Sequence, residues 1–398
     1  MLLLILCTLV LLSTLASALV KNIVVFGDDY SDVGTGHRYS NGPLWSQQLA
    51  VGWDASLHSF AFSGSVCNAS SSVSIVDQAE MYYQQHLELD PQYTIYAFWV
   101  GHADVQAKML ANDTNYEDTL DCIMDQMRTV RKVFKTDRFL MFTLAPMDLM
   151  PGALALSKKE QQRIKQAVDS FNEQLHEKVF AQVKHHHLLE LDLVDAHDLL
   201  VEVIQRPEDY GFKNGQDAFW DHCQGRCNDK EDDYIWWDKQ HLTGNAHHII
   251  AKSILMSDSM EPSVNLPFLD QVRTKVDQPH SIFHSPLYHK PHTHTGLLDR
   301  LVQQINDAKK QQDKEITADD NEQTAVDAEE GFWLQPLYWM ALVTIVVCIG
   351  FVLCGKQMQR RRMTGGLAAL SGLVNQKRHQ DTSTRGQFTR LRQLDTSV

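Results

Sequence analysis

Two short polar stretches, far apart in the sequence, carry side chains that could do acid–base chemistry. In the first, an apolar run ends at Gly27 and an acidic turn that contains Asp29 follows. In the second, Asp238 precedes His241 by three residues. A carboxylate at this spacing can hold an imidazole in place within a tight turn, as a general base requires. If the fold brings Asp29 to His241, we expect an ion pair with the two side chains within about 5 Å.

Other interpretations of these residues do not need a catalytic base. Asp238 could cap a helix while His241 packs, although the position of the pair, late in the domain and just before a helix, favours a site. The aspartates Asp28, Asp29 and Asp32 could also converge with the histidine as ligands of a divalent cation. No metal-binding motif accompanies them, so we expect neither a metal nor a cofactor.

The elements that would position these side chains alternate between strands and helices. Apolar runs predict strands at residues 22–26, 93–100, 138–144 and 188–194. Each strand and the helix that follows it together form a unit of a length typical of βαβ crossovers. Such crossovers produce a parallel sheet, whose ligands lie outside the carboxyl ends of the strands. Residues 41–49 predict a turn that opens a helix. Further helices are predicted at residues 75–89, 116–134 and 157–184, in a segment that ends at residue 204, and from about residue 245.

Five segments, in order, resemble the sequence blocks of the GDSL, or SGNH, ester hydrolases. The first reads Phe-Gly-Asp-Asp-Tyr-Ser-Asp where that family has roughly F-G-D-S-x-S-D, and the last contains the D-x-x-H pattern. The resemblance is nearest to fungal GDSL esterases and thermolabile-haemolysin-like lipases. It implies an α/β fold, a three-layer α/β/α sandwich with a parallel sheet of the SGNH-hydrolase or flavodoxin-like type. The five segments are residues 22–34, 59–65, 98–104, 144–148 and 236–243.

The resemblance also assigns roles to single residues. The family's serine nucleophile falls on Asp29, and the asparagine of its oxyanion hole falls on Ala103, so both groups are replaced. Gly64 stands where a backbone N–H helps to form the oxyanion hole. Asp238 and His241 stand where the family has its acid and its general base. The implied catalytic positions are therefore Asp29, Asp238 and His241, with an oxyanion donor at Gly64.

A carboxylate at the nucleophile position changes the expected chemistry. Asp29 would place negative charge where an ester carbonyl must become an oxyanion. It would also pair with His241, raise the pKa of that imidazole and remove it as a base. Asp29 could instead attack as a carboxylate nucleophile, or Ser31 could replace the missing serine.

Two functions follow from this reading. The first is a membrane-anchored carboxylic ester hydrolase for acylated glycans or lipids, impaired or inactive because the serine and the asparagine are absent. The second is a pseudoenzyme, a receptor-like membrane protein that binds a glycan or acyl ligand in the old cleft, and the chemistry favours it. Core packing explains at least half of the tryptophans that could line such a cleft: Trp45, Trp53, Trp99, Trp236 and Trp237.

Four cysteines lie outside the two long apolar runs of the chain. An even number in an oxidising compartment suggests two disulfides, with three possible pairings. We favour a disulfide between Cys223 and Cys227, which would close a short loop. This leaves Cys67–Cys122 by elimination. A zinc site is the alternative, but a lone C-x₃-C in a secretory context argues against it.

The two apolar runs predict passage through the secretory pathway. Residues 1–18 end in Ala-Ser-Ala, as a signal peptide does. Residues 332–354 contain no charge and would span about 34 Å as a helix, enough to cross a bilayer. Arginines follow, so the positive-inside rule predicts a type I single-pass protein with a lumenal or extracellular body and a cytosolic C-terminus. Sequons at Asn68 and Asn112 predict glycosylation of that body.

These signals divide the chain into five parts. Between the domain and the membrane we expect an acidic, partly disordered stalk, with a short helix near residues 297–305 and five histidines between His280 and His294. Those histidines could bind metal, but a solvated linker explains them more simply. The parts are residues 1–18 (signal peptide), 19–260 (hydrolase-type domain), 261–331 (stalk), 332–354 (transmembrane helix) and 355–398 (basic tail).

Charge is unevenly distributed along the chain. The tail from residue 355 has nine Lys/Arg and two Asp/Glu, a net +7, which leaves −21 for the rest of a chain whose total is −14. An acidic body repels nucleic acid, so we expect no nucleic-acid partner. The expected partners are an acylated glycan or lipid and the membrane, against which the basic tail could lie.

Overall fold

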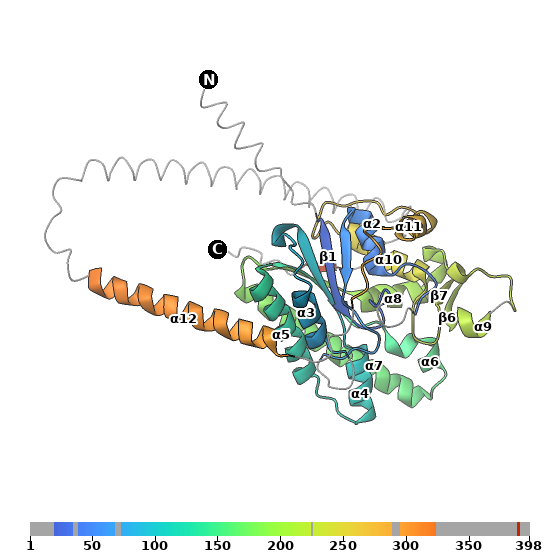
Figure 1. Cartoon of the computed structure of the whole chain (residues 1–398). Helices are drawn as coiled ribbons and strands as arrows, with labels where there is room; N and C mark the ends of the chain where they lie inside the picture. Colours follow the sequence, from blue (N-terminus) through green and yellow to red (C-terminus); the bar gives the residue numbers. More distant parts are fainter. Residues whose placement is uncertain are drawn as a thin grey trace, which may run out of the picture. The chain divides into compact units, whose positions relative to one another are not determined.

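The computed structural model describes residues 20–34, 39–67, 73–223, 226–288, 295–323 and 388–390 (Figure 1). The chain divides into two compact units, residues 1–302 with 384–398 and residues 303–383. The strands of the described chain, and the residues that the sequence proposes for a site, belong to the first unit.

A six-stranded sheet forms the centre of the first unit. Five strands are parallel in the order β2-β1-β3-β4-β5, and the short β8 pairs antiparallel with β5. The predicted parallel sheet is confirmed. The sequence did not predict β2 as a strand, because Ser-Leu-His-Ser contains no apolar run. The strands are β1 Asn22–Gly27, β2 Ser56–Ser59, β3 Thr94–Trp99, β4 Arg138–Phe142, β5 Glu190–Val194 and β8 Phe388–Arg390.

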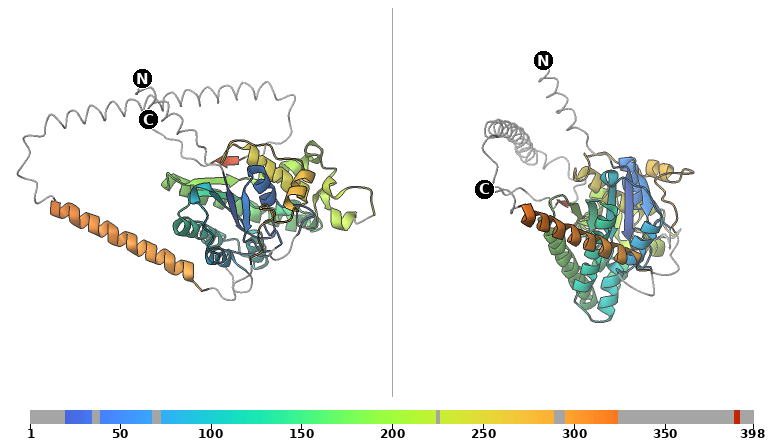
Figure 2. Two further views of the ribbon diagram at one scale, coloured as in Figure 1. Left: turned by 45° about the horizontal axis from the view of Figure 1, so that its top comes forward. Right: turned by 60° about the vertical axis from the view of Figure 1, so that its left-hand side comes forward.

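Helices cover both faces of this sheet, as Figures 1 and 2 show. Alternate residues of β1 belong to two hydrophobic cores: Ile23 and Val25 to one, Val24 and Phe26 to the other. The first core includes α2 (Trp45–Trp53), α8 (Ala196–Gln205) and α10 (Gly244–Met256). The second includes α3 (Ile75–Gln84), α5 (Glu117–Phe134) and α7 (Lys158–His185). The three-layer α/β/α sandwich is therefore confirmed.

Short elements fill the connections that the sequence left as loops. A second, two-stranded sheet pairs β6 (Asn214–Ala218) with β7 (Tyr234–Trp236). It escaped prediction because Asn-Gly-Gln-Asp-Ala has no apolar alternation. The small helices are α4 (His102–Leu110), α6 (Pro151–Leu154) and α9 (Phe219–His222).

The segment after residue 260 packs on the domain, so the predicted stalk is wrong for this part of the chain. Helix α11 (Leu269–Val276) buries Val272 and Val276 against Val51 of α2. These two valines lie four residues apart, a helical spacing that the acidic composition of the segment obscured. The helix that was expected near residues 297–305 forms, but α12 extends over Leu297–Gln323.

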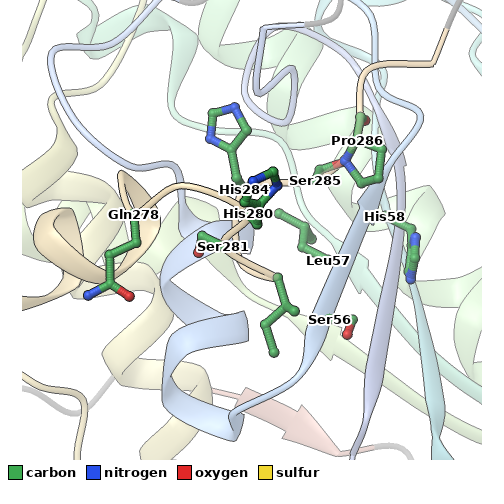
Figure 3. A pocket seen from close by; sticks show the side chains of 10 residues that line it. Ser56, Leu57, His58, Gln278, His280, Ser281, His284, Ser285 and Pro286 are labelled. Atoms are coloured by element: carbon green, nitrogen blue, oxygen red, sulfur yellow. The ribbon is translucent and has the colours of Figure 1, made fainter.

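The residues that follow α11 cover the outer edge of β2. The N–H of Leu57 donates to the carbonyl of Ile282 (2.9 Å), and the N–H of Ser59 donates to Ser285 Oγ (2.8 Å). An uncovered edge strand leaves its backbone groups without partners in the protein, which explains why this segment is held there. A pocket of about 490 Å³ lies between β2 and this covering segment. Its lining includes His58 on β2 and His280 and His284 on the covering segment (Figure 3).

Both predicted disulfides form. Cys67 is bonded to Cys122, which ties the segment after β2 to α5, and Cys223 is bonded to Cys227. The predicted start of the long helix is also confirmed, because Ser157 and Glu160 form a reciprocal capping box.

Several predictions fall outside the described residues. These are the signal peptide, the apolar run at residues 332–354 and the sequon at Asn68. None of the helices in the described part of the chain combines the length and hydrophobicity that a membrane crossing requires.

Candidate active site

The first part of the site is the turn that follows β1. A Cβ on Gly27 would lie 2.5 Å from the carbonyl oxygen of Trp99, so only glycine allows β1 and β3 to end side by side here. The N–H of Asp28 then donates to the same carbonyl (3.2 Å), and a tight turn closes as the N–H of Ser31 donates to the carbonyl of Asp28 (2.9 Å). Asp29 lies in this turn with 27% of its side chain exposed.

The second part is the turn between β7 and α10. Asp238 Oδ1 accepts the N–H groups of Gln240 and His241, both at 2.8 Å. The same carboxylate holds the imidazole, with His241 Nδ1 2.7 Å from Asp238 Oδ2. The N–H of Trp237 donates to the carbonyl of His241 (2.8 Å), which fixes the turn to the small second sheet. The Asp-x-x-His spacing therefore shapes the backbone and orients the ring at once.

The fold brings the two turns together at Asp29. Its Oδ2 lies 3.7 Å from His241 Nε2, so the predicted approach within about 5 Å is confirmed. Its Oδ1 accepts the N–H of Gly64 at 2.6 Å. Gly64 has φ +71°, a left-handed conformation that favours glycine. Asp29 thus contacts both the donor and the imidazole that the resemblance assigned to catalysis.

The imidazole of His241 lies between two carboxylates. Burial alone would lower its pKa, but the hydrogen bonds and charges of Asp238 and Asp29 raise it to about 9. Burial raises the pKa of each carboxyl, but His241 and the backbone N–H donors together lower it by more, so both pKa values lie below the usual range. At neutral pH the site therefore holds an imidazolium between two carboxylates, and the imidazolium has no lone pair for base catalysis.

A second histidine–carboxylate pair is linked to the first through Tyr30. His102 Nδ1 is 3.0 Å from Asp28 Oδ2, and His102 Nε2 accepts the N–H of Ala145 (3.1 Å). No local pattern predicts that His102 and Asp28 pair, although both lie within matched blocks. The Tyr30 ring stacks on His102 at 4.4 Å, and its hydroxyl donates to the carbonyl of Gln240 (2.6 Å). Tyr30 therefore connects the buried pair to the turn that carries His241.

Comparison with known proteins connects the chain to one protein family. A family model described as GDSL-like Lipase/Acylhydrolase matches residues 23–254, more than half of the 398 residues. The chain belongs to this family. GDSL esterase/lipase 4 of Arabidopsis thaliana is 28% identical over 208 residues, which cover 44% of this chain and 53% of that protein. The chain thus spans about half the length of that relative.

Two solved structures are similar to this chain. One is a member of the lipolytic G-D-S-L family from Veillonella parvula DSM 2008, with 13% identity and a TM-score of 0.35, over 58% of this chain and 94% of that chain. The other, from Parabacteroides merdae ATCC 43184, is described as GDSL-like and has 11% identity and a TM-score of 0.33, over 59% of this chain and 94% of that chain.

The two remaining aspartates of the GDSL-type turn do not face His241. Asp28 contacts His102, and Asp32 Oδ2 accepts both the N–H and the hydroxyl of Ser63, each at 2.9 Å. The idea that Asp28, Asp29 and Asp32 converge on one cation is therefore wrong. Within the described ranges, no three His, Cys, Asp or Glu side chains are grouped so that they could hold a metal ion.

Ser31 cannot replace the missing serine in this structure. Its side chain is fully buried, and its hydroxyl accepts the indole N–H of Trp45 (3.3 Å). Ser31 therefore stabilises the turn, and its hydroxyl is not exposed to act as a nucleophile.

The block that contains Ala103 forms the start of α4. Gly101, with φ +124°, precedes the helix, and Ala103 lies half-buried in its first turn. One residue later, the Asp104 carboxylate accepts the N–H of Cys67 (3.1 Å) and so holds the loop that carries Gly64. Burial raises the pKa of Asp104 to about 6, and the charge of Asp28 adds to this.

Most of the tryptophans that could have lined a ligand cleft belong to the core. Trp45, Trp99 and Trp236 are fully buried. Trp237 is half-buried beside the turn of His241, and its ring lies 5.3 Å from that of Trp220. Trp220 is 52% exposed and was missed by the sequence analysis, because nothing in its local pattern distinguishes it from a core aromatic residue.

Proposed function

We propose that this GDSL-family protein is anchored in a membrane and binds an acyl or glycan ligand without hydrolysing carboxylic esters. The observation that carries the proposal is the position of the Asp29 carboxylate. One of its oxygens accepts the N–H of Gly64, and the other faces the imidazole of His241. Asp29 therefore interacts both with the N–H that would stabilise an oxyanion and with the imidazole that would accept a proton.

Each consequence of this arrangement opposes ester hydrolysis. The nucleophile has no hydroxyl, and the carboxylate repels the negative charge that develops on an ester carbonyl. Removal of one oxyanion-hole donor alone lowers the rate by about 10²- to 10³-fold. Removal of the nucleophile leaves only a residual acceleration on the order of 10³ over water. Together these losses favour a binding role over turnover of esters.

The aromatic side chains beside the His241 turn support a ligand of this chemical class. The rings of Trp220 and Trp237 lie 5.3 Å apart, and the backbone N–H of Trp237 donates to the carbonyl of His241. Indole faces bind the apolar faces of sugars and acyl chains while the N–H remains available to water. The family's description as lipases and acylhydrolases agrees with such a ligand.

The test is ester hydrolysis by the full chain and two restored variants. We expect no turnover of short acyl esters by the wild type, and turnover by Asp29→Ser that increases when Ala103→Asn is added. Hydrolysis by the wild type that His241→Ala abolishes would overturn the proposal and identify the chain as an active esterase. Arg128→Ala is the matched control, because Arg128 forms an exposed ion pair with Asp125.

The membrane anchor is supported by the uncharged run at residues 332–354 and by the basic residues that follow it. In the structure, Phe388–Arg390 pairs with β5 of the domain that carries the site. A type I topology would hold that strand and β5 on opposite sides of the membrane, so the two arrangements exclude each other. Protease treatment of intact microsomes distinguishes them: we expect a C-terminal epitope to be digested and the body to be protected.

Glycosylation gives a second test of the lumenal body. Asn112 is exposed in a loop, where its side-chain oxygen accepts a hydrogen bond from Arg163 (2.6 Å). We expect Asn112→Gln to remove one endoglycosidase-sensitive shift in gel mobility. A wild-type chain without any such shift would contradict the lumenal placement.

A further inference from the structure

The ring of Tyr39 covers one face of the His241 imidazole. The two rings are nearly parallel, with an angle of 12° between their planes and 4.3 Å between their centroids. At its nitrogens the imidazole meets carboxylates, since Nδ1 lies 2.7 Å from Asp238 Oδ2 and Nε2 lies 3.7 Å from Asp29 Oδ2. The imidazole therefore has a carboxylate at each nitrogen and an aromatic ring on one face.

A stacked aromatic ring distinguishes between the two protonation states of the imidazole. The face of an aromatic ring carries negative partial charge, so it attracts a cation more strongly than it attracts a neutral ring. His241 is the cation at neutral pH, because the two carboxylates outweigh burial and raise its pKa to about 9. Its side chain is only 12% exposed, which limits the competition of water with this attraction. The stack with Tyr39 therefore acts in the same direction as the two carboxylates.

The backbone next to Tyr39 is fixed to the backbone that follows His241. Asn41 Oδ1 accepts the N–H of Gly244 at 2.8 Å. The chains also touch at Gly42, where a Cβ would lie 2.9 Å from Cα of Gly244. Asn41 is two residues from Tyr39, and Gly244 is three residues from His241. This junction therefore brings the two rings together.

A helix outside the family match supports the same junction. Asn41 Nδ2 donates to Asp232 Oδ1 at 3.2 Å, and Arg273 of α11 donates to both oxygens of Asp232 (2.6 and 2.7 Å). Helix α11 lies beyond residue 254, where the match to the family model ends. The segment after the family match thus contacts the residues that fix the position of Tyr39.

We infer that Tyr39 is a positioning residue of this site, whose ring face holds the imidazolium of His241 between the carboxylates of Asp29 and Asp238. The inference rests on the proposed function, because it names a third group, besides the two carboxylates, that keeps the imidazole protonated and unable to act as a base. It also gives a role to a segment that lies outside the five blocks of the resemblance.

The other titratable groups around His241 do not replace Tyr39. Asp29 and Asp238 meet the imidazole at its nitrogens and not at its face. The Tyr30 ring is tilted by 48° to the imidazole, with 6.2 Å between the centroids, and it stacks on His102 instead. The face contact is therefore made by Tyr39, and its removal should change the protonation of His241.

The test is an NMR titration of His241 in the full chain in detergent. In Tyr39→Leu the imidazole stays covered by an apolar side chain but loses the aromatic face. We expect its pKa to fall by about half a unit to one unit, roughly a three- to tenfold change in the protonation equilibrium. In Tyr39→Phe the face remains, so the pKa should equal that of the wild type. Tyr83→Leu, at a half-buried tyrosine of α3, is the matched control and should leave it unchanged.

A second variant tests the junction without removing the ring. Asn41→Ala loses the hydrogen bonds to Gly244 and Asp232, so Tyr39 is no longer fixed over the imidazole. The pKa of His241 should fall, as it does in Tyr39→Leu. Asn115→Ala is the matched control, because Asn115 is exposed and its side chain accepts only a local N–H, that of Glu117 (3.0 Å).

Two results would overturn the inference. One is a pKa of His241 that does not change in Tyr39→Leu, and the other is an equal decrease in Tyr39→Leu and Tyr39→Phe, which would assign the effect to the hydroxyl. Either result leaves the binding role intact, since that role depends on the absence of ester turnover by the wild type. Ester turnover by the wild type would refute the binding role, whereas the titration would still decide the role of Tyr39.

Discussion

The molecule contains two histidine–carboxylate pairs that differ in burial and in the number of carboxylates around the ring. His102 and Asp28 are 9% and 1% exposed, and the second ring nitrogen of His102 accepts a backbone N–H. His241 is 12% exposed, but its partners Asp29 and Asp238 are 27% and 29% exposed. The Nε2 of His102 faces a single backbone N–H, whereas His241 lies between two carboxylates, which raise its pKa to about 9 and make it an imidazolium at neutral pH.

The difference shows what each pair does. The buried pair joins the turn after β1 to the end of β4 through Ala145, and Tyr30 extends this link to the turn of His241. In the more exposed pair, the charged groups of His241 and its carboxylate partners are accessible to a ligand. One pair supports the scaffold and the other is available for chemistry, so the same residue types should respond differently to mutation.

The largest effect is expected from His102→Ala. This change leaves the Asp28 carboxylate buried without its imidazole and the N–H of Ala145 without an acceptor. Loss of one partner of a buried pair typically lowers the free energy of unfolding by about 3–5 kcal/mol. Thermal and urea unfolding of the purified protein measure it. Arg128→Ala, which removes an exposed ion pair, should change stability by less than about 1 kcal/mol. Equal effects of the two variants would contradict the scaffold role.

The next effect is a loss of stability at alkaline pH. The pKa of His241 is raised to about 9 in the folded protein, above its ordinary value of 6.5. The contribution of His241 to the free energy of unfolding is therefore complete below about pH 6.5 and disappears as the pH rises through about 9. Its upper limit is about 3 kcal/mol. Unfolding measured from pH 6 to pH 10 should show this decline in the wild type and a smaller decline in His241→Gln. The same slope in both proteins would assign it to other groups.

A smaller effect is expected on the pKa of His241 when Asp29 loses its charge. Asp29→Asn keeps the size of the side chain but removes one of the two carboxylates beside the ring. The pKa of His241 should fall by about 1 unit, while Asp238 keeps it from falling further. Titration of the ring by NMR measures it, with the wild type as the reference. An unchanged pKa would mean that Asp29 and His241 do not interact in solution.

The smallest effect is expected from Tyr30→Phe. The variant keeps the ring stacked on His102 but loses the hydrogen bond from the hydroxyl to Gln240. Removal of one such hydrogen bond lowers the free energy of unfolding by about 1 kcal/mol. Hydrogen exchange should also increase in the turn at residues 238–241, more than in α5. A uniform increase would argue against a specific link between the two pairs.

Much of the fold could be predicted because it depends on local patterns. Near-continuous apolar runs identified β1, β3, β4 and β5, and the spacing of Ser157 and Glu160 identified the start of α7. The elements that were missed have weak local signals: β2 is four residues long, and β6 contains no apolar alternation. The segment after residue 260 was misjudged because its role, which is to cover the edge of β2, is a property of the folded sheet.

The sequence alone determined that Asp29 stands where the family has its serine and that Asp238 lies within reach of His241, because both facts depend on local order and spacing. Only the tertiary structure decided that Asp29 accepts the Gly64 N–H and that His102 pairs with Asp28, 74 residues away. The physical reason is the register of the parallel strands. Gly27 of β1 lies opposite Trp99 of β3, and this pairing, which no local pattern contains, brings Asp28 and His102 together at the same end of the sheet.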